Sequence, residues 1–303
     1  MGKIYILYNP LAGNGKCREN IEILKKLRDE LEYVDMSKID YRGFFASVEA
    51  DARLIICGGD GTLNRFVNDT RGIDIKNPVY LYSVGTGNDF ARDLGYTRAS
   101  YPDFEINEYI KNLPEVSVNG EKKLFINNVG FGIDGYCCEV GDALREKNLR
   151  EKSDKPIDYS AIAIKGLLFH YKPTRARVTV DGIEHIYEKV WIAPTMNGRY
   201  YGGGMMPTPD QKRPDPESKA SVMVFHGTGK LKTLCIFPSL FKGKHIKHKK
   251  HISILRGREI SVEFDSPRAL QIDGETVLGV TGYSVKGAPL CDPASEKFEA
   301  AAV

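Results

Sequence analysis

The sequence contains no apolar run that approaches the roughly 18 residues of a membrane-spanning helix, so none is predicted. Its opening residues, MGKIYILYNP, lack the long apolar segment and cleavage site of a secretory signal. The six cysteines show no C-x-x-C spacing, and we expect reduced thiols in a cytoplasmic protein. A net charge of +3 does not by itself predict nucleic-acid binding.

Two common phosphate-binding motifs are also missing. Walker A requires G-x-x-x-x-G-K-[ST], but Pro10 stands where the first glycine belongs and Cys17 follows Gly15 and Lys16. The dinucleotide pattern G-x-G-x-x-G fails because GNGKCR ends in Arg18. Any nucleotide site in this chain must therefore use a different loop.

The N-terminal part instead repeats a strand, a glycine loop and a helix. β-favouring apolar runs at residues 3–10, 52–57 and 78–84 are followed by NPLAGNGK, GGDGT and GTGND. Helical spacing follows each loop, and the first such helix is expected over residues 17–32. This order predicts a doubly wound, parallel α/β domain, with all three loops at the carboxyl ends of the strands.

After about residue 115 short β-type runs alternate with turn residues, which is typical of antiparallel sheets. We expect one helix among them, at residues 158–171. The predicted domains are therefore an α/β domain of residues 1–118 with 286–303, and a β-rich domain, expected to be a β-sandwich, of residues 119–285.

The glycine loops indicate a phosphate-binding crevice. Glycine lets backbone N–H groups approach a ligand, and such groups leading into a helix form an anion site. One loop alone would be read as a plain turn, but three at strand ends favour the crevice. Asp60 would repel phosphates there, so it either caps the next helix, meets them through Mg²⁺ or accepts a proton from an attacking hydroxyl.

At this point the motifs resemble those of diacylglycerol kinases and related lipid kinases. The motifs are GGDGTLN, GTGNDFAR, NPLAGNGK, YYGGGMMPTPDQK at residues 200–212 and IDGE at residues 272–275. NAD kinases share GGDGT, so the longer motifs discriminate. The resemblance spans nearly the whole chain and implies two domains with ATP in the cleft between them. It also implies Mg²⁺-dependent transfer of the γ-phosphate to a lipid hydroxyl.

The resemblance also assigns roles to individual residues. Asp60 and Glu275 are the expected catalytic residues, with Asp273 supporting Glu275; which of the three is the general base stays open. From the residues alone, DGE at 273–275 could equally be a turn between two strands. Nucleotide binding is assigned to Asn9, Pro10, Gly13, Gly58, Gly59, Gly61, Thr62, Asn64, Thr86, Gly87, Asn88 and Asp89.

Two positions depart from the family pattern. Arg65 stands where relatives commonly carry glutamate, which reverses a charge next to the central loop. The K-L-D-D-G loop that holds a structural Mg²⁺ in bacterial relatives corresponds here to KRPDPESKAS at residues 212–221. Asp215 is the candidate metal ligand that remains in this segment.

A lipid kinase must reach a bilayer, and residues 234–251 are the candidate contact. KGKHIKHKKH at 242–251 contains five lysines and three histidines, and LCIFPSLF at 234–241 is apolar. The same residues could form a solvated loop and part of the core. His245, His248 and His251 lack acidic or cysteine partners, so a metal site is not expected.

The sequence thus predicts an ATP- and Mg²⁺-dependent lipid kinase, with diacylglycerol as the first acceptor to test. One alternative is an NAD kinase, based on GGDGT. The other is a nucleotide-binding membrane regulator that has lost catalysis, which Arg65 favours. No nucleic-acid partner is expected, and the oligomeric state, monomer or homodimer, is left open.

Overall fold

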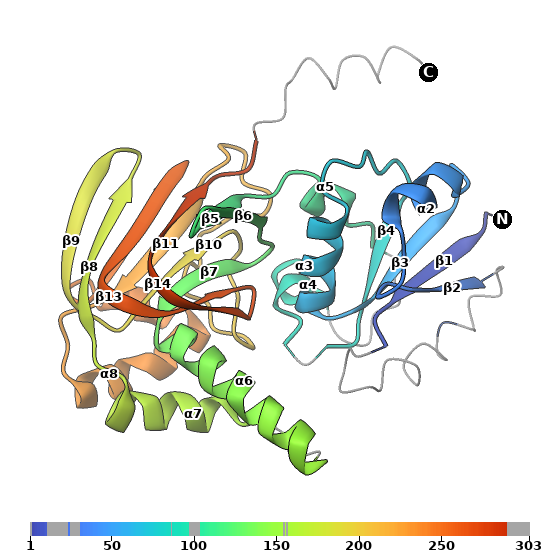
Figure 1. Ribbon diagram of the computed structural model, residues 1–303. Helices are drawn as coiled ribbons and strands as arrows, with labels where there is room; N and C mark the ends of the chain where they lie inside the picture. Colours follow the sequence, from blue (N-terminus) through green and yellow to red (C-terminus); the bar gives the residue numbers. More distant parts are fainter. Residues whose placement is uncertain are drawn as a thin grey trace.

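The fold is described from a computed structural model of the chain (Figure 1). The structure describes residues 2–10, 24, 31–85, 87–96, 104–153, 155 and 157–289. Most of the predicted helix over residues 17–32 lies outside this part. Its last two positions, Leu31 and Glu32, begin a strand instead of ending a helix.

The first sheet is parallel and confirms the α/β prediction. Its described strands lie in the order β2-β1-β3-β4, and every neighbouring pair is parallel. Three of them are the predicted runs, whereas β2 and α2 were not predicted. The elements are β1 (Ile4–Tyr8), β2 (Leu31–Asp35), α2 (Tyr41–Ser47), β3 (Arg53–Gly58), α3 (Asp60–Asp69), β4 (Val79–Ser83), α4 (Asp89–Asp93) and α5 (Asn107–Ile110).

Both faces of this sheet are buried, as a doubly wound fold requires. Leu7 and Ile56 on one face pack with Phe66 of α3. Ile6 and Cys57 on the opposite face lie in a second apolar cluster. Because successive strand residues point to opposite faces, these runs are apolar throughout, which is why the sequence identified them as strands.

The second sheet forms the β-sandwich. Its ten described strands include the long pair β13 and β14, which connects the layers. The first half of β13 pairs with β8, its last residues pair with β7, and the register shifts between Glu263 and Arg268. The strands are β5 (Glu115–Val118), β6 (Glu121–Leu124), β7 (Asn128–Gly132), β8 (Thr174–Val180), β9 (Ile183–Val190), β10 (Ile192–Met196), β11 (Ala220–Phe225), β12 (Ile252–Gly257), β13 (Glu259–Ile272) and β14 (Glu275–Lys286).

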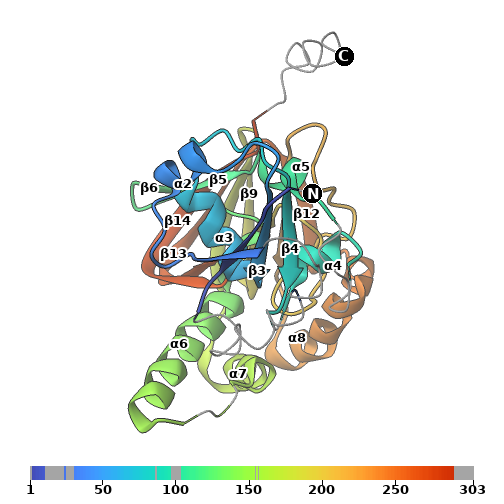
Figure 2. The same ribbon diagram turned by 90° about the vertical axis from the view of Figure 1, so that its right-hand side faces the viewer.

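Helices gather at one end of the sandwich, where Figures 1 and 2 show α6, α7 and α8 together. The predicted helix at 158–171 is confirmed as α7 and a π-helical turn, η2, but α6 and α8 were not predicted. These elements are α6 (Ile133–Glu151), α7 (Tyr159–Lys165), η2 (Gly166–His170), α8 (Lys230–Ile236), η3 (Phe237–Lys242) and η4 (Lys244–Lys247). Within the described residues, no helix is long and apolar enough to cross a bilayer.

The predicted domain boundary at residue 118 is too late. Strand β5 pairs with β14 and β6, so it belongs to the second sheet and the boundary lies before Glu115. Lys286 ends β14, and Gly287 donates its N–H to the Arg258 carbonyl 2.7 Å away in the same domain. The return of the chain to the first domain therefore does not begin at 286, and residues 290–303 lie outside the described part.

Candidate functional site

The carboxyl ends of three adjacent strands bring the predicted loops together. Parallel pairing sets Tyr8 of β1 beside Cys57 of β3, and Gly58 beside Ser83 of β4. The described residues that follow these strands, which in the first loop are Asn9 and Pro10, therefore leave the sheet at one edge. Gly13 and Thr86, assigned to the same nucleotide site, lie outside the described residues.

Packing requires one glycine in GGDGT and one in GTGND. A Cβ at Gly58 would lie 2.3 Å from the Thr62 side chain, and one at Gly85 would lie 2.6 Å from the Gly59 Cα. The central and third loops thus touch backbone to backbone. A Cβ at Gly61, in contrast, would meet no atom of the described residues within 4 Å, so this glycine faces space in that part of the structure where a ligand can approach.

Asp60 joins the central loop to the third. Its Oδ2 accepts the Asp89 N–H at 2.9 Å and its Oδ1 accepts the Phe90 N–H at 3.0 Å. These are the first amides of α4, so Asp60 caps that helix from outside its own element. Asp60 does cap a helix, but that helix is α4, so the expectation that it caps the next helix, α3, is wrong.

The N-terminus of α3 remains available for an anion. Thr62 and Leu63 donate their N–H groups to the Gly59 carbonyl, and Gly59, the N-cap residue, has no side chain with which to cap this helix. A helix N-terminus presents several N–H groups without an intrahelical acceptor, and the helix dipole favours negative charge there. The open space beside Gly61 lies at this end of α3.

Asp89 is a second carboxylate at the same place. Its Oδ2 accepts the Gly203 N–H of the other domain at 2.7 Å, while its buried Oδ1 has no hydrogen-bond partner among the described residues. Burial, followed by the nearby charge of Asp60, raises the pKa of Asp89 to about 6. A Cβ at Gly87 would lie 3.6 Å from Asp89 Oδ2 and 3.7 Å from Asp60 Oδ2, so both carboxylates flank this glycine.

Asp273 ties the sandwich to the first domain. It follows β13 with φ 47° and forms a tight turn with Gly274, so the turn interpretation of this motif is correct. Its carboxylate accepts three consecutive backbone N–H groups, from residues 126–128 at 2.6–2.9 Å, and the Asn64 Nδ2 at 2.7 Å. Burial outweighs these donors and raises the pKa of Asp273 to about 6.

Glu275 lies in a different environment on the same turn. Its side chain is 57% exposed, and its Oε2 lies 3.2 Å from the Lys123 Nζ of β6. Asp273 is held by the domain junction, whereas Glu275 remains able to reach a ligand. The catalytic role expected for Glu275 stays a prediction.

The sequence reasoning missed a carboxylate inside the second domain. Asp134, in the first turn of α6, is buried and accepts its neighbour's N–H at 2.9 Å, from Gly135. Gln271 Nε2 lies 3.4 Å from its Oδ2, and Gln271 Oε1 accepts the Gly274 N–H at 2.9 Å. Burial raises the pKa of Asp134 to about 6. A polar chain thus runs from α6 to the Asp273 turn.

One signal in the sequence could have revealed Asp134. It lies two residues after the buried, glycine-containing strand β7, in the first turn of the helix that begins at Ile133. This is the same order of strand, glycine and helix that marked the first-domain loops.

A buried ion-pair network also crosses the junction and was not predicted. Arg213 Nε lies 2.9 Å from Asp93 Oδ2, and both side chains are only 2% exposed. Arg199 Nε approaches the other oxygen of Asp93 at 2.7 Å. Arg213 Nη2 also donates to the Asn127 side chain at 2.8 Å. The loop that follows β10 is therefore fixed against α4.

Asp215, the candidate metal ligand, is occupied by other contacts. Its Oδ1 accepts the N–H groups of Glu217 and Lys219 at 3.0 and 3.1 Å, and Oδ2 pairs with Arg256. The described part of the chain contains no group of three or more His, Cys, Asp or Glu that could hold a metal ion. Metal binding by Asp215 remains an untested prediction.

Arg65 points away from the loops. Its Nε lies 3.2 Å from Asp69 Oδ2, one helical turn further along α3, and both side chains are solvent-accessible. Asn64, one residue earlier, faces the domain junction. The reversed charge at position 65 is therefore at the surface of α3.

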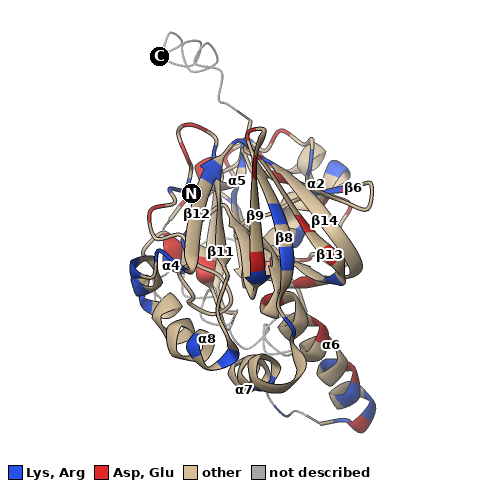
Figure 3. Ribbon diagram, turned by 90° about the vertical axis from the view of Figure 1, so that its left-hand side faces the viewer, with Lys and Arg blue, Asp and Glu red and all other residues tan. Residues whose placement is uncertain are grey.

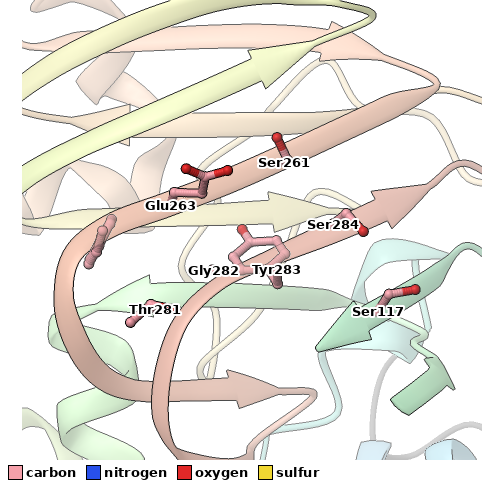
Figure 4. Close-up of a pocket in the computed structure, with 8 residues that line it drawn as sticks. Ser117, Ser261, Glu263, Thr281, Gly282, Tyr283 and Ser284 are labelled. Carbon is pink, nitrogen blue, oxygen red and sulfur yellow. The ribbon is translucent and has the colours of Figure 1, made fainter. Parts of the chain in front are cut away.

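A hollow of about 410 Å³ lies elsewhere, on the β-sandwich (Figure 4). Hydroxyl groups of β5, β13 and β14 line it, together with Glu263 and Gly282. None of the predicted catalytic or nucleotide-binding residues lines this hollow, so it is separate from the candidate site.

Comparisons with known proteins agree with this architecture. Residues 3–116 match the family model of the diacylglycerol kinase catalytic domain, and residues 127–291 match that of the YegS C-terminal NAD kinase beta sandwich-like domain. A diacylglycerol kinase of Mycobacterium tuberculosis is 26% identical over 87% of this chain and 85% of its own.

Two further relatives extend the comparison. A diacylglycerol kinase of Bacillus subtilis is 26% identical over 91% of this chain and 90% of its own. A crystal structure of a Bacillus anthracis diacylglycerol kinase has a TM-score of 0.59 and 19% identity, covering 96% of this chain and 97% of its own. At that identity the structure supports the fold.

Proposed function

The chain belongs to the lipid kinases that combine a diacylglycerol kinase catalytic domain with a YegS-type β-sandwich domain, and we propose that it transfers the γ-phosphate of ATP to the free hydroxyl of diacylglycerol. The product would be phosphatidic acid. The supporting observation is a chain of contacts between the domains. Asp60 of the central glycine loop bonds the N–H of Asp89 in the third loop, and the Asp89 carboxylate bonds the Gly203 N–H of the other domain.

The first-domain loops fit the phosphates of ATP. The uncapped N-terminus of α3 and the open space beside Gly61 provide amides and room for negative oxygens. Asp60 holds the third loop against the central one through two hydrogen bonds. This fixes the amides before the nucleotide arrives, and phosphoryl transfer depends mainly on such positioning.

The carboxylates fit Mg²⁺ that arrives with the nucleotide. Asp89 Oδ1 is a buried oxygen to which no residue in the described part of the chain donates a hydrogen bond, and Mg²⁺ prefers oxygen ligands from one or two carboxylates together with phosphates. Asp89 and Asp60 would hold the ion, which when bound would neutralise charge on the phosphate oxygens. The lack of a larger acidic cluster in the described residues suits an ion shared with phosphate.

The second domain supplies the groups expected to meet the acceptor. Glu275 is the exposed carboxylate at the junction, and we assign to it the proton of the attacking hydroxyl. Asp273 positions it by fixing the turn. The names of the Mycobacterium and Bacillus relatives favour diacylglycerol as the acceptor.

An acceptor panel tests this proposal. Labelled γ-phosphate of ATP is offered with Mg²⁺ to mixed micelles that contain diacylglycerol, a sphingoid base or ceramide, and separately to NAD. We expect label in phosphatidic acid, and a loss of at least about a hundredfold in Glu275→Gln. Label in another lipid would change the acceptor, and label only in NAD would overturn the proposal.

A further inference from the structure

Two segments of the second domain carry lysine but no acidic residue. Residues 159–172 and 229–251 together contain nine lysines and neither Asp nor Glu, although the whole chain has a net charge of only +3. They form α7, η2, α8, η3 and η4. Such a concentration of one charge on a nearly neutral chain marks a surface for an anionic partner.

The two segments lie side by side. Lys230 Nζ, at the start of α8, donates to the Leu168 carbonyl of η2 at 2.6 Å. In Figure 3, α7 and α8 lie together along the lower edge of the domain. Residues far apart in the sequence thus form one face, which we name the docking surface: residues 159–172 and 229–247.

Large apolar side chains project from this surface. Leu231 and Phe169, each next to a residue of the Lys230–Leu168 contact, are 75% and 72% exposed, and Phe241 is 45% exposed. Ile236 and Leu240 on the same helices are buried. The inward positions already supply the packing of these helices, so Phe169 and Leu231 add nothing to the core.

This arrangement revises the membrane contact expected from the sequence. Within residues 234–241 the buried Ile236 and Leu240 belong to the core. The exposed apolar residues come instead from the start of α8, the end of η3 and the separate segment η2. Only the fold brings these positions together, which is why the sequence missed Phe169.

We propose that the docking surface binds the surface of an anionic lipid bilayer, with Phe169 and Leu231 entering the boundary between headgroups and acyl chains. The lysines, including Lys232, Lys244 and Lys247, contact the headgroups. Exposed apolar residues beside basic ones are the arrangement that binds in this interfacial layer. The proposal deepens the proposed function, since it names where the enzyme meets the membrane that holds its acceptor.

The docking surface is connected to the candidate site. Met206 donates its N–H to the Leu240 carbonyl at 2.9 Å, and His245 Nε2 lies 2.8 Å from the Pro207 carbonyl oxygen. The loop that contains these two residues also contains Gly203, which bonds Asp89. One loop therefore touches both the docking surface and the phosphate-site carboxylate.

Vesicle co-sedimentation without ATP tests the proposal. We expect the full chain to bind phosphatidylcholine vesicles that contain phosphatidylglycerol, to bind pure phosphatidylcholine weakly, and to lose binding as salt rises. The double variant Phe169→Ala/Leu231→Ala should bind about tenfold more weakly. Lys244→Gln should lose about fivefold.

Matched variants elsewhere provide the controls. Ile183→Ala/Leu278→Ala removes apolar groups that are 65% and 62% exposed on β9 and β14. Lys76→Gln removes a lysine whose side chain is 83% exposed in the first domain. Both should bind vesicles like the unaltered chain.

The outcomes separate docking from catalysis. If docking variants phosphorylate a dispersed short-chain diacylglycerol normally but fail on vesicles, the docking surface is supported. If no acceptor is phosphorylated yet vesicle binding needs Phe169 and Leu231, docking stands and the proposed function fails. Equal vesicle binding by the control variants and by the variants at Phe169, Leu231 and Lys244 would overturn the proposed docking surface. Binding of the unaltered chain to double-stranded DNA but not to vesicles would also overturn it.

Discussion

Four aspartates around the domain junction have different partners and therefore different roles. Asp60 accepts the first amides of α4, and Asp273 accepts the amides of residues 126–128. Asp89 keeps one oxygen that no described residue bonds, and Asp134 is buried beside Gly135 and the Gln271 side chain. Residue type alone did not distinguish them, because each role depends on which N–H groups the fold places opposite the carboxylate.

Ionisation of Asp89 should control the pH dependence of phosphate transfer. Its pKa is raised to about 6 by burial and by Asp60, with Arg92 nearby opposing that shift. The ionised form that suits Mg²⁺ therefore appears as pH rises through about 6, and we expect the transfer rate to rise there. The measurement is the pH profile of kcat/KM, which reports the groups of the free enzyme.

The variant Asp89→Asn identifies the group responsible. Asp89→Asn should transfer phosphate much more slowly, and its rate should no longer rise near pH 6. Asp69→Asn, on the exposed side of α3, should keep the transfer rate of the unaltered chain and its rise near pH 6. An unchanged inflection in Asp89→Asn would assign the titration to another group, such as Asp273 or Asp134.

Asp134 should make stability depend on pH. Its pKa is raised from 3.8 to about 6 in the folded chain, so the folded state holds a proton that the unfolded state has released. The resulting stability is present below about pH 4 and is lost as pH rises through about 6. Asp134→Asn should reduce this fall in the free energy of unfolding by up to about 3 kcal/mol.

Urea unfolding at several pH values measures this effect. Glu146→Gln, a change on the exposed side of the same helix, should leave the pH-dependent fall in the free energy of unfolding unaltered. If the free energy of unfolding fell equally with pH in Asp134→Asn and in the unaltered chain, the fall could not be assigned to Asp134.

At the scale of elements, the strands and loops of the first domain were predictable and several helices were not. Apolar runs ending in glycine located β1, β3 and β4, because strands buried on both faces need continuous apolar sequence. α6 was missed since its sequence, IDGYCCEVGDALREKNLRE, has only a weak apolar stripe. The helix after the third loop, α4, was expected, but the sequence did not show that its capping carboxylate comes from Asp60.

The turn between β13 and β14 should stabilise the domain junction. Asp273→Asn would replace one accepting oxygen by an NH₂ group that faces the backbone N–H groups of residues 126–128. Two donors cannot bond each other, so we expect a loss of about 2–4 kcal/mol in the free energy of unfolding. Asn64→Ala should lower the free energy of unfolding by about 1–2 kcal/mol. The double variant should lose less than the sum of the two single losses, because Asn64 and Asp273 share a hydrogen bond.

Chemical denaturation of the single and double variants checks this coupling. Glu275→Gln, exposed on the same hairpin, should change stability by less than about 0.5 kcal/mol. Strict additivity of Asn64→Ala and Asp273→Asn would show that the contact does not operate in solution.

At the scale of the whole molecule, polar contacts hold the two domains together. Asn68 pairs with both the N–H and the carbonyl of Leu124, at 2.9 and 3.0 Å, and Arg213 reaches Asp93 across the junction. Sequence patterns located the residues of each domain but not these pairings, because partners more than fifty residues apart leave no local signal. The junction itself therefore required the structure.

Arg213 should contribute far more to stability than Arg199, although both pair with Asp93. Arg213→Met leaves the buried Asp93 carboxylate with only the partly exposed Arg199, among the described residues, as a positively charged partner. We expect the free energy of unfolding to fall by about 3–5 kcal/mol. Arg199 is 40% exposed, so Arg199→Met should cost less than about 1 kcal/mol. Urea unfolding measures both, and equal small losses would contradict a buried network.

The most direct test of the central claim is phosphate transfer by Asp60→Asn. Asp69→Asn, nine residues further along the same helix, is the matched control. With labelled ATP, Mg²⁺ and diacylglycerol micelles, we predict transfer by the unaltered chain and the control, and a loss of at least about a hundredfold in Asp60→Asn with its fold retained. Full activity of a folded Asp60→Asn protein would contradict the placement of the phosphate site.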